Sequence, residues 1–297
     1  MKRFFALSRT THGVLDLAMP GFVALLWLGD FPQWHVILLS LFTAFAAYTA
    51  IYALNDLVGF AMDKEKFVGG INAGYSVESS DMRYPLAQNI LPYKSGLFWF
   101  IGWFALALVG SYLLNPTIVV ILIAAAILEV IYCLLLKVTY LRTFVSGLVK
   151  SSGPIAAIYV VDPNPNIQLV LLILAWVFFW EIGGQNIPAD WNDTVEDLRV
   201  HAKTIPLQLG TQKAGIIVLL TLGMTIIISM FLPLVSPLHL GWSYQLASAL
   251  AGIYLLFKAG YELYKNQEGR LAAKLFDNAS YYPMAQLMIV SIFVLFN

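Results

Sequence analysis

The chain has 297 residues, of which 60% are hydrophobic and 11% are charged, and its formal net charge is zero. This composition excludes an ordinary soluble domain, in which apolar and polar residues alternate along each helix or strand, and zero net charge gives no overall field that would recruit nucleic acid. The single cysteine, Cys133, excludes a disulfide within the chain and a cysteine-based metal cluster.

The N-terminal segment predicts the first membrane span. It begins with basic residues, as a signal peptide does, but Arg9, His12 and Asp16 interrupt the apolar stretch that a signal peptide needs. We therefore expect an uncleaved span at about residues 13–29.

Further apolar blocks follow, each long enough to cross a bilayer as a helix. Together they predict an all-α polytopic membrane protein with nine transmembrane helices, formed by a single domain over residues 1–297. The predicted spans are residues 13–29, 35–54, 96–114, 116–136, 144–161, 167–183, 213–232, 241–259 and 281–296.

The placement of charge predicts the topology. All 17 Lys and Arg residues fall on one side of the predicted spans. By the positive-inside rule that side is cytoplasmic, which puts the N-terminus inside and the C-terminus outside, in the cell inner membrane. Apart from Asp30 and Asp162, the acidic residues share this bias, so we expect the chemistry on the cytoplasmic face.

Two cytoplasmic connections are long, at about residues 55–95 and 184–212, and each opens with an acidic stretch. Long loops with structure of their own are usually functional. In the first stretch, NDLVGFAMD (55–63), Asn55, Asp56, Gly59 and Asp63 fall within a sector of about 100° if the stretch is helical.

The second acidic stretch is NIPADWNDTVED, residues 186–197. If it continues as a helix, Asp190, Asp193 and Asp197 lie within a sector of about 60°. Like charges at this spacing repel one another, so a positive group should offset them.

Two acidic faces opposed across a cavity would suit a metal-bridged diphosphate, because Mg²⁺ takes oxygen ligands from one or two carboxylates and from phosphate groups. Basic side chains near both stretches could share in neutralising the diphosphate. The alternative is that the carboxylates are solvated interfacial charges and that the basic residues only determine topology. The basic residues in question are Arg83, Lys137, Arg142 and Lys203.

At these residues the chain resembles the UbiA superfamily of intramembrane prenyltransferases. That family carries N-D-x-x-D-x-x-x-D after its second helix and D-x-x-x-D after its sixth. Here the first motif reads Asn55-Asp56-Leu57-Val58-Gly59-Phe60-Ala61-Met62-Asp63, so that Gly59 replaces the middle aspartate. The second motif runs from Asp193 to Asp197, with Asp190 upstream.

Flanking segments also resemble the family. Arg83-Tyr84-Pro85-Leu86 is similar to its R-P-L segment with one insertion, and Lys203-Thr204-Ile205-Pro206 is similar to its K-T-L-P segment. Tyr132 and Lys137 resemble a Tyr and Lys pair that the family usually spaces one residue closer.

The resemblance implies nine transmembrane helices with helical cytoplasmic cap loops that carry the two motifs. It implies Mg²⁺-dependent transfer of an isoprenyl group from an isoprenyl diphosphate to a small aromatic or other lipid-precursor acceptor, at the cytoplasmic face of the lipid bilayer. The implied catalytic residues are Asp56, Asp63, Asp193 and Asp197, which with Asn55 and Asp190 are also the implied metal ligands.

Residues of the matching segments and polar residues near them are candidates for binding the two substrates. The diphosphate would be bound by Asn55, Arg83, Lys137, Arg142 and Lys203. His12, Asp16 and Tyr132 are candidates for the acceptor side, although His12 and Asp16 could equally be interfacial polar residues.

Two other functions stay open at this point. A CDP-alcohol phosphatidyltransferase-like enzyme also uses clustered aspartates and a divalent metal, but its D-G-x-x-A-R signature is absent from the sequence. A transporter of an ion or metabolite would place ionisable groups near the bilayer midplane, whereas Asp16, Glu129 and Glu181 are expected near the cytoplasmic ends of their spans. The sequence does not reveal the acceptor, the prenyl chain length or the oligomeric state.

Overall fold

The computed structural model describes residues 1–66 and 83–296, and the regular structure in these two ranges is entirely helical. Within them, nine helical runs are long and apolar enough to cross a membrane, which confirms the predicted all-α polytopic class. Residues 67–82 of the first long connection lie outside the described residues.

Several spans are built from consecutive helices. In chain order the nine runs are α2 (Thr10–Asp16) with α3 (Ala18–Leu28); α4 (Trp34–Lys66); α5 (Tyr93–Leu114); α6 (Pro116–Leu134) with η1 (Leu135–Lys137); α7 (Arg142–Val161); α8 (Ile167–Trp180) with η2 (Glu181–Asn186) and α9 (Ile187–Asn192); α12 (Thr211–Ser229); α13 (Gly241–Gly252) with η4 (Ile253–Phe257) and α14 (Lys258–Asn266); and α15 (Gly269–Phe296). The short helices are α1 (Lys2–Leu7), α10 (Thr194–Arg199), α11 (Ile205–Leu209) and η3 (Leu232–Val235).

Two of the short connections use side-chain caps that the sequence signals. Asn115 precedes Pro116, and its side chain accepts a 2.9 Å hydrogen bond from the Thr117 N–H at the start of α6. Asn166 caps α8 in the same way, through the N–H of Gln168. Asparagine caps of this kind satisfy N–H groups that have no partner within the helix, which fixes where each span begins.

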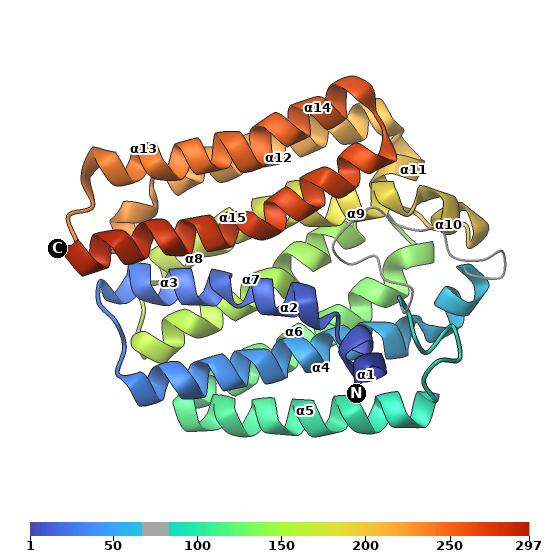
Figure 1. Cartoon of the computed structure of the whole chain (residues 1–297), viewed down its shortest axis with the longest axis horizontal. Coiled ribbons are helices and arrows are strands. Elements are labelled where there is room, and N and C mark those ends of the chain that lie inside the picture. The colour runs from blue at the N-terminus through green and yellow to red at the C-terminus, as the bar shows by residue number, and fades with distance from the viewer. Residues whose placement is uncertain (67–82, 297) are drawn as a thin grey trace.

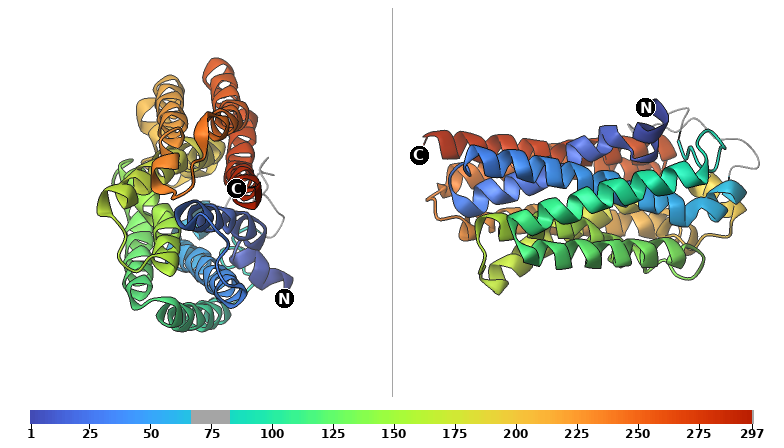
Figure 2. Two further views of the ribbon diagram at one scale, coloured as in Figure 1. Left: turned by 90° about the vertical axis from the view of Figure 1, so that its left-hand side faces the viewer. Right: turned by 90° about the horizontal axis from the view of Figure 1, so that it is seen from below.

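The spans form one bundle in which each packs against the next along the chain. The last span, α15, also packs against α3 of the first. Figure 2 shows this arrangement looking along the helices. The N-terminus lies at the end of the bundle that carries α9 and α10, and the C-terminus lies at the opposite end (Figure 1).

The largest buried apolar cluster is formed mainly by α3, α8 and the helices from α12 to α15. Phe22 of α3, Trp176 and Trp180 of α8 and Tyr282 of α15 are fully buried there. The outward faces of the spans are apolar instead of polar, as the exposed side chains of Val120 and others show. A surface of that kind suits a surrounding of lipid tails.

Three spans extend at least nine residues beyond the predicted apolar blocks. The second runs to Lys66, the sixth runs through η2 and α9 to Asn192, and the last begins at Gly269. In both the second and the sixth, several polar residues beyond the apolar block are buried in the bundle, among them Asp56, Asp63 and Asp190, so the helix continues past the apolar block. Glu181, which we expected near a span end, therefore lies well inside the sixth span.

Candidate active site

A polar pocket of about 120 Å³ lies where the end of α4 meets α9 and α10. Asn55 and Asp63 from α4 line it together with Asp190, Asp193 and Asp197 from the second acidic stretch. Two segments that are far apart in the sequence thus present their carboxylates to one space, as the sequence predicted.

The first acidic stretch lies within α4 itself, so the expected helical face exists. Asn55, Gly59 and Asp63 line the pocket, while Asp56 is buried beside it. Asp56 Oδ1 lies 3.5 Å from Arg9 Nη2, and the same guanidinium donates a 3.3 Å hydrogen bond to Asn55 Oδ1.

The second acidic stretch is not one continuous helix, which corrects the geometry expected from the sequence. α9 ends at Asn192 and α10 begins at Thr194, because the backbone at Asp193 departs from helical angles, with φ −96° and ψ 10°. The Asp193 carbonyl still accepts from the Asp197 N–H at 2.9 Å. The break therefore changes the angles between the carboxylates without removing any of them from the pocket.

Each carboxylate of the second acidic stretch that lines the pocket has a basic partner. Arg142 Nη2 lies 2.5 Å from Asp190 Oδ1, Lys66 Nζ lies 2.7 Å from Asp197 Oδ1, and Arg83 is paired with Asp193. Arg83 and Arg142 were predicted to lie here; Lys66 and Arg9 were not. Lys66 lies one helical turn beyond Asp63 on the same face of α4. It was missed because the second span was predicted to end at residue 54.

Arg83 lies outside the membrane-spanning runs and is largely buried. Burial acts to lower the pKa of Arg83, but attraction to Tyr84 and Asp193 outweighs it and holds this pKa above its usual value. Arg83 therefore stays charged at any physiological pH, as a side chain that binds an anion must.

The structure does not bring Lys137 and Lys203 into this pocket. Lys137 Nζ lies 2.7 Å from Glu65 Oε2 in an exposed pair. Lys203 is exposed, and its backbone N–H donates to the carbonyl of Leu136 at 2.7 Å. Their proposed contact with a diphosphate stays a prediction that the pocket geometry does not support.

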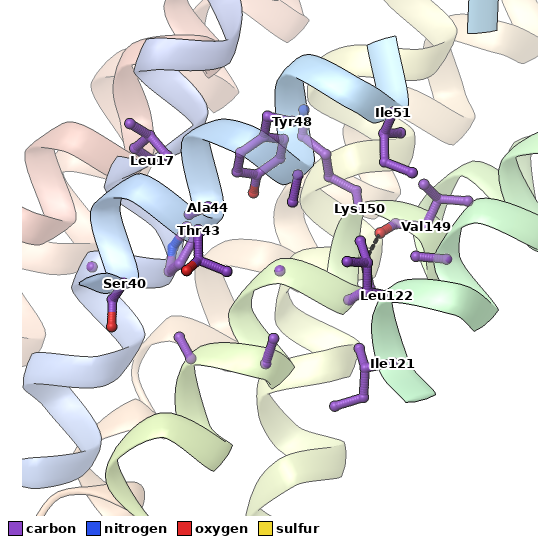
Figure 3. Close-up of a pocket in the computed structure, with 18 of the residues that line it drawn as sticks. Leu17, Ser40, Thr43, Ala44, Tyr48, Ile51, Ile121, Leu122, Val149 and Lys150 are labelled. Carbon is purple, nitrogen blue, oxygen red and sulfur yellow. Dashed lines mark hydrogen bonds between the residues drawn. The ribbon is translucent and has the colours of Figure 1, made fainter. Parts of the chain in front are cut away.

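A second, larger space continues from the polar pocket into the bundle. This cavity has a volume of about 470 Å³, and Arg9, Asn55 and Tyr132 line both spaces, so the two meet at their level. Its further part is mainly apolar. Figure 3 shows Ala44 and Ile51 of α4 among its lining side chains, together with Ile121 and Leu122 of α6.

The residues predicted for the acceptor side lie around this cavity, and Tyr132 lies where it meets the polar pocket. His12 lines it, and Asp16 is buried next to it, where it accepts from Lys150 Nζ at 2.7 Å and from the Tyr52 hydroxyl at 2.5 Å. The Tyr132 hydroxyl accepts a 2.9 Å hydrogen bond from Asn186 Nδ2.

Comparison with known proteins identifies the fold and the family. The model of the UbiA prenyltransferase family matches residues 17–284. The chain belongs to this family. A search of curated proteins found no match.

Solved structures of UbiA proteins share the fold at low sequence identity. A structure of digeranylgeranylglyceryl phosphate synthase is 16% identical, with a TM-score of 0.69 over 100% of this chain and 99% of that one. A UbiA homolog from Aeropyrum pernix K1 is 16% identical, with a TM-score of 0.72 over 94% and 98%. A UbiA homolog from Archaeoglobus fulgidus bound to DMAPP and Mg²⁺ is 13% identical, with a TM-score of 0.69 over 98% and 99%.

The pocket of this UbiA-family chain offers a donor set that fits a hard cation. Its potential ligands are carboxylate and amide oxygens, which Mg²⁺ prefers. Asp190 Oδ2 is buried and has no hydrogen-bond partner among the described residues, which leaves it available to a ligand. The described residues contain no group of three acidic, His or Cys side chains already converged on one point, so the carboxylates would have to leave their basic partners.

Proposed function

We propose that the protein transfers an isoprenyl group from an isoprenyl diphosphate to a small acceptor, with Mg²⁺ as its cofactor. One observation carries the proposal: the carboxylates of both acidic stretches line a single polar pocket that continues into a mainly apolar cavity. An isoprenyl diphosphate matches this arrangement, because its charged diphosphate fits the polar pocket and its apolar tail fits the cavity.

Asn55, Asp63, Asp190, Asp193 and Asp197 would hold Mg²⁺, which when bound stabilises the charge of the departing diphosphate. The basic partners of these carboxylates are then released to the diphosphate oxygens. Arg83, Arg142 and Lys66 would contribute charge-assisted hydrogen bonds that strengthen as the leaving group gains charge.

The cavity would bind the isoprenyl tail and keep water from the carbon that ionises. Breaking the carbon–oxygen bond leaves an allylic cation that water would quench, and an apolar enclosure lowers that risk. The relatives agree with this substrate class, because structures of the Archaeoglobus fulgidus homolog are described as bound to DMAPP and Mg²⁺ and to GPP and Mg²⁺.

We infer that the pocket faces the cytoplasm. The basic residues that flank the spans cluster on the pocket side, and the positive-inside rule assigns that side to the cytoplasm. The N-terminus would then be inside and the C-terminus outside, in keeping with their positions at opposite ends of the bundle (Figure 1).

Product analysis tests the proposal. The purified protein in vesicles is incubated with dimethylallyl, geranyl and geranylgeranyl diphosphates, Mg²⁺ and a panel of aromatic and glyceryl acceptors, and products are identified by mass spectrometry. We expect a prenylated acceptor that forms only with Mg²⁺. Diphosphate consumption without any prenylated product, or transport of an ion with no chemistry, would contradict it.

A further inference from the structure

Glu181 and Asn186 are the first and last residues of η2, and both line the cavity. η2 is a π-helix, in which hydrogen bonds run from residue i to i+5. In an α-helix two residues five apart would point about 140° away from each other. The π-helical segment instead brings the side chains at its two ends towards one side, and such segments are frequent at functional sites.

Two glycines set the orientation of this segment. A Cβ on Gly183 would lie 2.2 Å from Thr221 Oγ1 of α12, and one on Gly184 would lie 2.8 Å from Ala279 Cβ of α15. The backbone of η2 is therefore held tightly against α12 and α15. Its polar end residues are left to face the cavity.

Each of these two side chains keeps a buried oxygen without a donor. Ser146 donates to Glu181 Oε1 at 2.7 Å, but Glu181 Oε2 has no hydrogen-bond partner among the described residues. Asn186 Nδ2 donates to Tyr132, while Asn186 Oδ1 also lacks a partner within the described ranges. Glu181 is 6% exposed and Asn186 is 5% exposed. Buried acceptors of this kind normally bind a donor, so the cavity wall is prepared for hydroxyl or N–H groups.

The charges around the cavity argue against an anionic occupant of this site. Its two lining Lys and Arg side chains are already paired, Arg9 with Asp56 and Lys150 with Asp16. Glu181 also lines the cavity, and it has no basic partner within ion-pair distance in the part of the chain that the structure describes. A carboxylate or phosphate head group would thus meet a carboxyl group and cations that are engaged elsewhere.

We infer that Glu181 and Asn186 form the acceptor subsite, and that the acceptor is a neutral molecule bearing a hydroxyl group. The inference rests on the proposed prenyl transfer. The hydroxyl donates to Glu181 Oε2 or Asn186 Oδ1, and Asn186 lies one helical turn from Asp190 of the polar pocket. The acceptor is thereby held next to the carbon that the diphosphate leaves. Because the site contains the carboxyl group of Glu181, it favours a neutral acceptor over an acidic analogue.

Matched pairs of acceptors test the charge preference. With geranyl diphosphate and Mg²⁺, hydroquinone is compared with 4-hydroxybenzoate, 1,4-dihydroxynaphthalene with 1,4-dihydroxy-2-naphthoate, and glycerol with glycerol phosphate. We take the pair of acceptors that gives the highest activity. Within that pair, we expect kcat/KM for the neutral compound to exceed kcat/KM for the acidic compound by about tenfold or more.

The variant Glu181→Gln tests the residue. It keeps the size of the side chain, removes the carboxylate and offers an amide that can donate. We expect the KM for hydroquinone to rise about tenfold and the preference over 4-hydroxybenzoate to narrow or reverse, with Mg²⁺-dependent binding of geranyl diphosphate unchanged. The matched control is Asp162→Asn, which removes a carboxylate that binds Trp27 away from the cavity and should alter neither quantity.

The outcomes separate the inference from the function beneath it. The inference would be overturned if the wild type preferred the acidic acceptors, or if Glu181→Gln had the same acceptor preference as the wild type. In either case, intact binding of geranyl diphosphate would leave the proposed function standing. Absence of that binding from the wild-type protein would overturn both.

Discussion

Lys66 at the end of α4 lies 2.7 Å from Asp197 of α10, through Nζ and Oδ1, and so joins the two acidic stretches directly. Both side chains are nearly fully buried. Removing one member of a buried ion pair leaves an uncompensated charge, which costs about 3–5 kcal/mol. The pair therefore contributes both to the fold of the pocket and to its electrostatic balance.

We predict that Lys66→Met lowers the melting temperature of the purified protein, because Asp197 is left buried without its cation. Mg²⁺ should recover part of the loss, since the freed carboxylate can then serve as a ligand. Thermal unfolding with and without Mg²⁺ measures both effects. The same unfolding shift in Mg²⁺ for variant and wild type would show that Asp197 does not reach the metal.

Arg83 and Lys203 should differ in their effects, although both were candidates for the diphosphate. Arg83 lines the pocket and contacts Asp193, whereas Lys203 is exposed outside it. We expect Arg83→Ala to weaken the use of isoprenyl diphosphate by about 10- to 100-fold, the usual value of a hydrogen bond to a charged group. Lys203→Ala serves as the control and should stay within about twofold of the wild type. Comparable losses of activity in both variants would show that Lys203 also binds the diphosphate, although it lies outside the pocket.

Gly59 faces the pocket at the position where the family motif has an aspartate. A Cβ there would lie 3.0 Å from Asp63 Oδ2, which is tight, and a further carboxylate would repel Asp63 as well as occupy space. We predict that Gly59→Asp reduces turnover while Mg²⁺ binding is retained or tightened. Activity is titrated against Mg²⁺ for Gly59→Asp, Gly59→Ala and wild type, so that the effect of the methylene group is separated from that of the charge. Three superimposable curves would mean that position 59 does not face the site.

The apolar part of the cavity should limit the length of the prenyl donor. Ala44 lines it on α4, and Ala44→Phe would fill space that a long tail needs. We expect the ratio of activities with geranylgeranyl and dimethylallyl diphosphates to fall at least about tenfold. Leu38→Phe, at an exposed position on the same helix, is the control for the added ring. An unchanged ratio in Ala44→Phe would place the tail elsewhere.

The sequence was sufficient for the number of spans and for the convergence of the acidic stretches. Long apolar blocks indicate membrane spans directly. The helical period placed Asn55 and Asp63 on one face, and this holds whether residues 55–63 continue the span or form a separate helix. Lys66 was missed because falling hydropathy was read as the end of the span. In the structure, α4 continues to Lys66, and Asn55, Asp63 and Lys66 on one of its faces line the pocket.

Other features depend on tertiary structure and carry no local signal. Examples are the break between α9 and α10 at Asp193 and the positions of Lys137 and Lys203 outside the pocket. The π-helical geometry that brings Glu181 and Asn186 to one side is likewise invisible to a 3.6-residue period.

Binding of radiolabelled geranyl diphosphate tests the central claim most directly, because the claim is that both acidic stretches hold one metal-bridged diphosphate. Wild-type protein, Asp63→Asn from α4 and Asp190→Asn from α9 are compared with and without Mg²⁺. We predict tight, Mg²⁺-dependent binding by the wild type and a large loss in each variant, with all three proteins folded. Binding that ignores Mg²⁺, or that survives unchanged when either stretch is altered, would contradict the account.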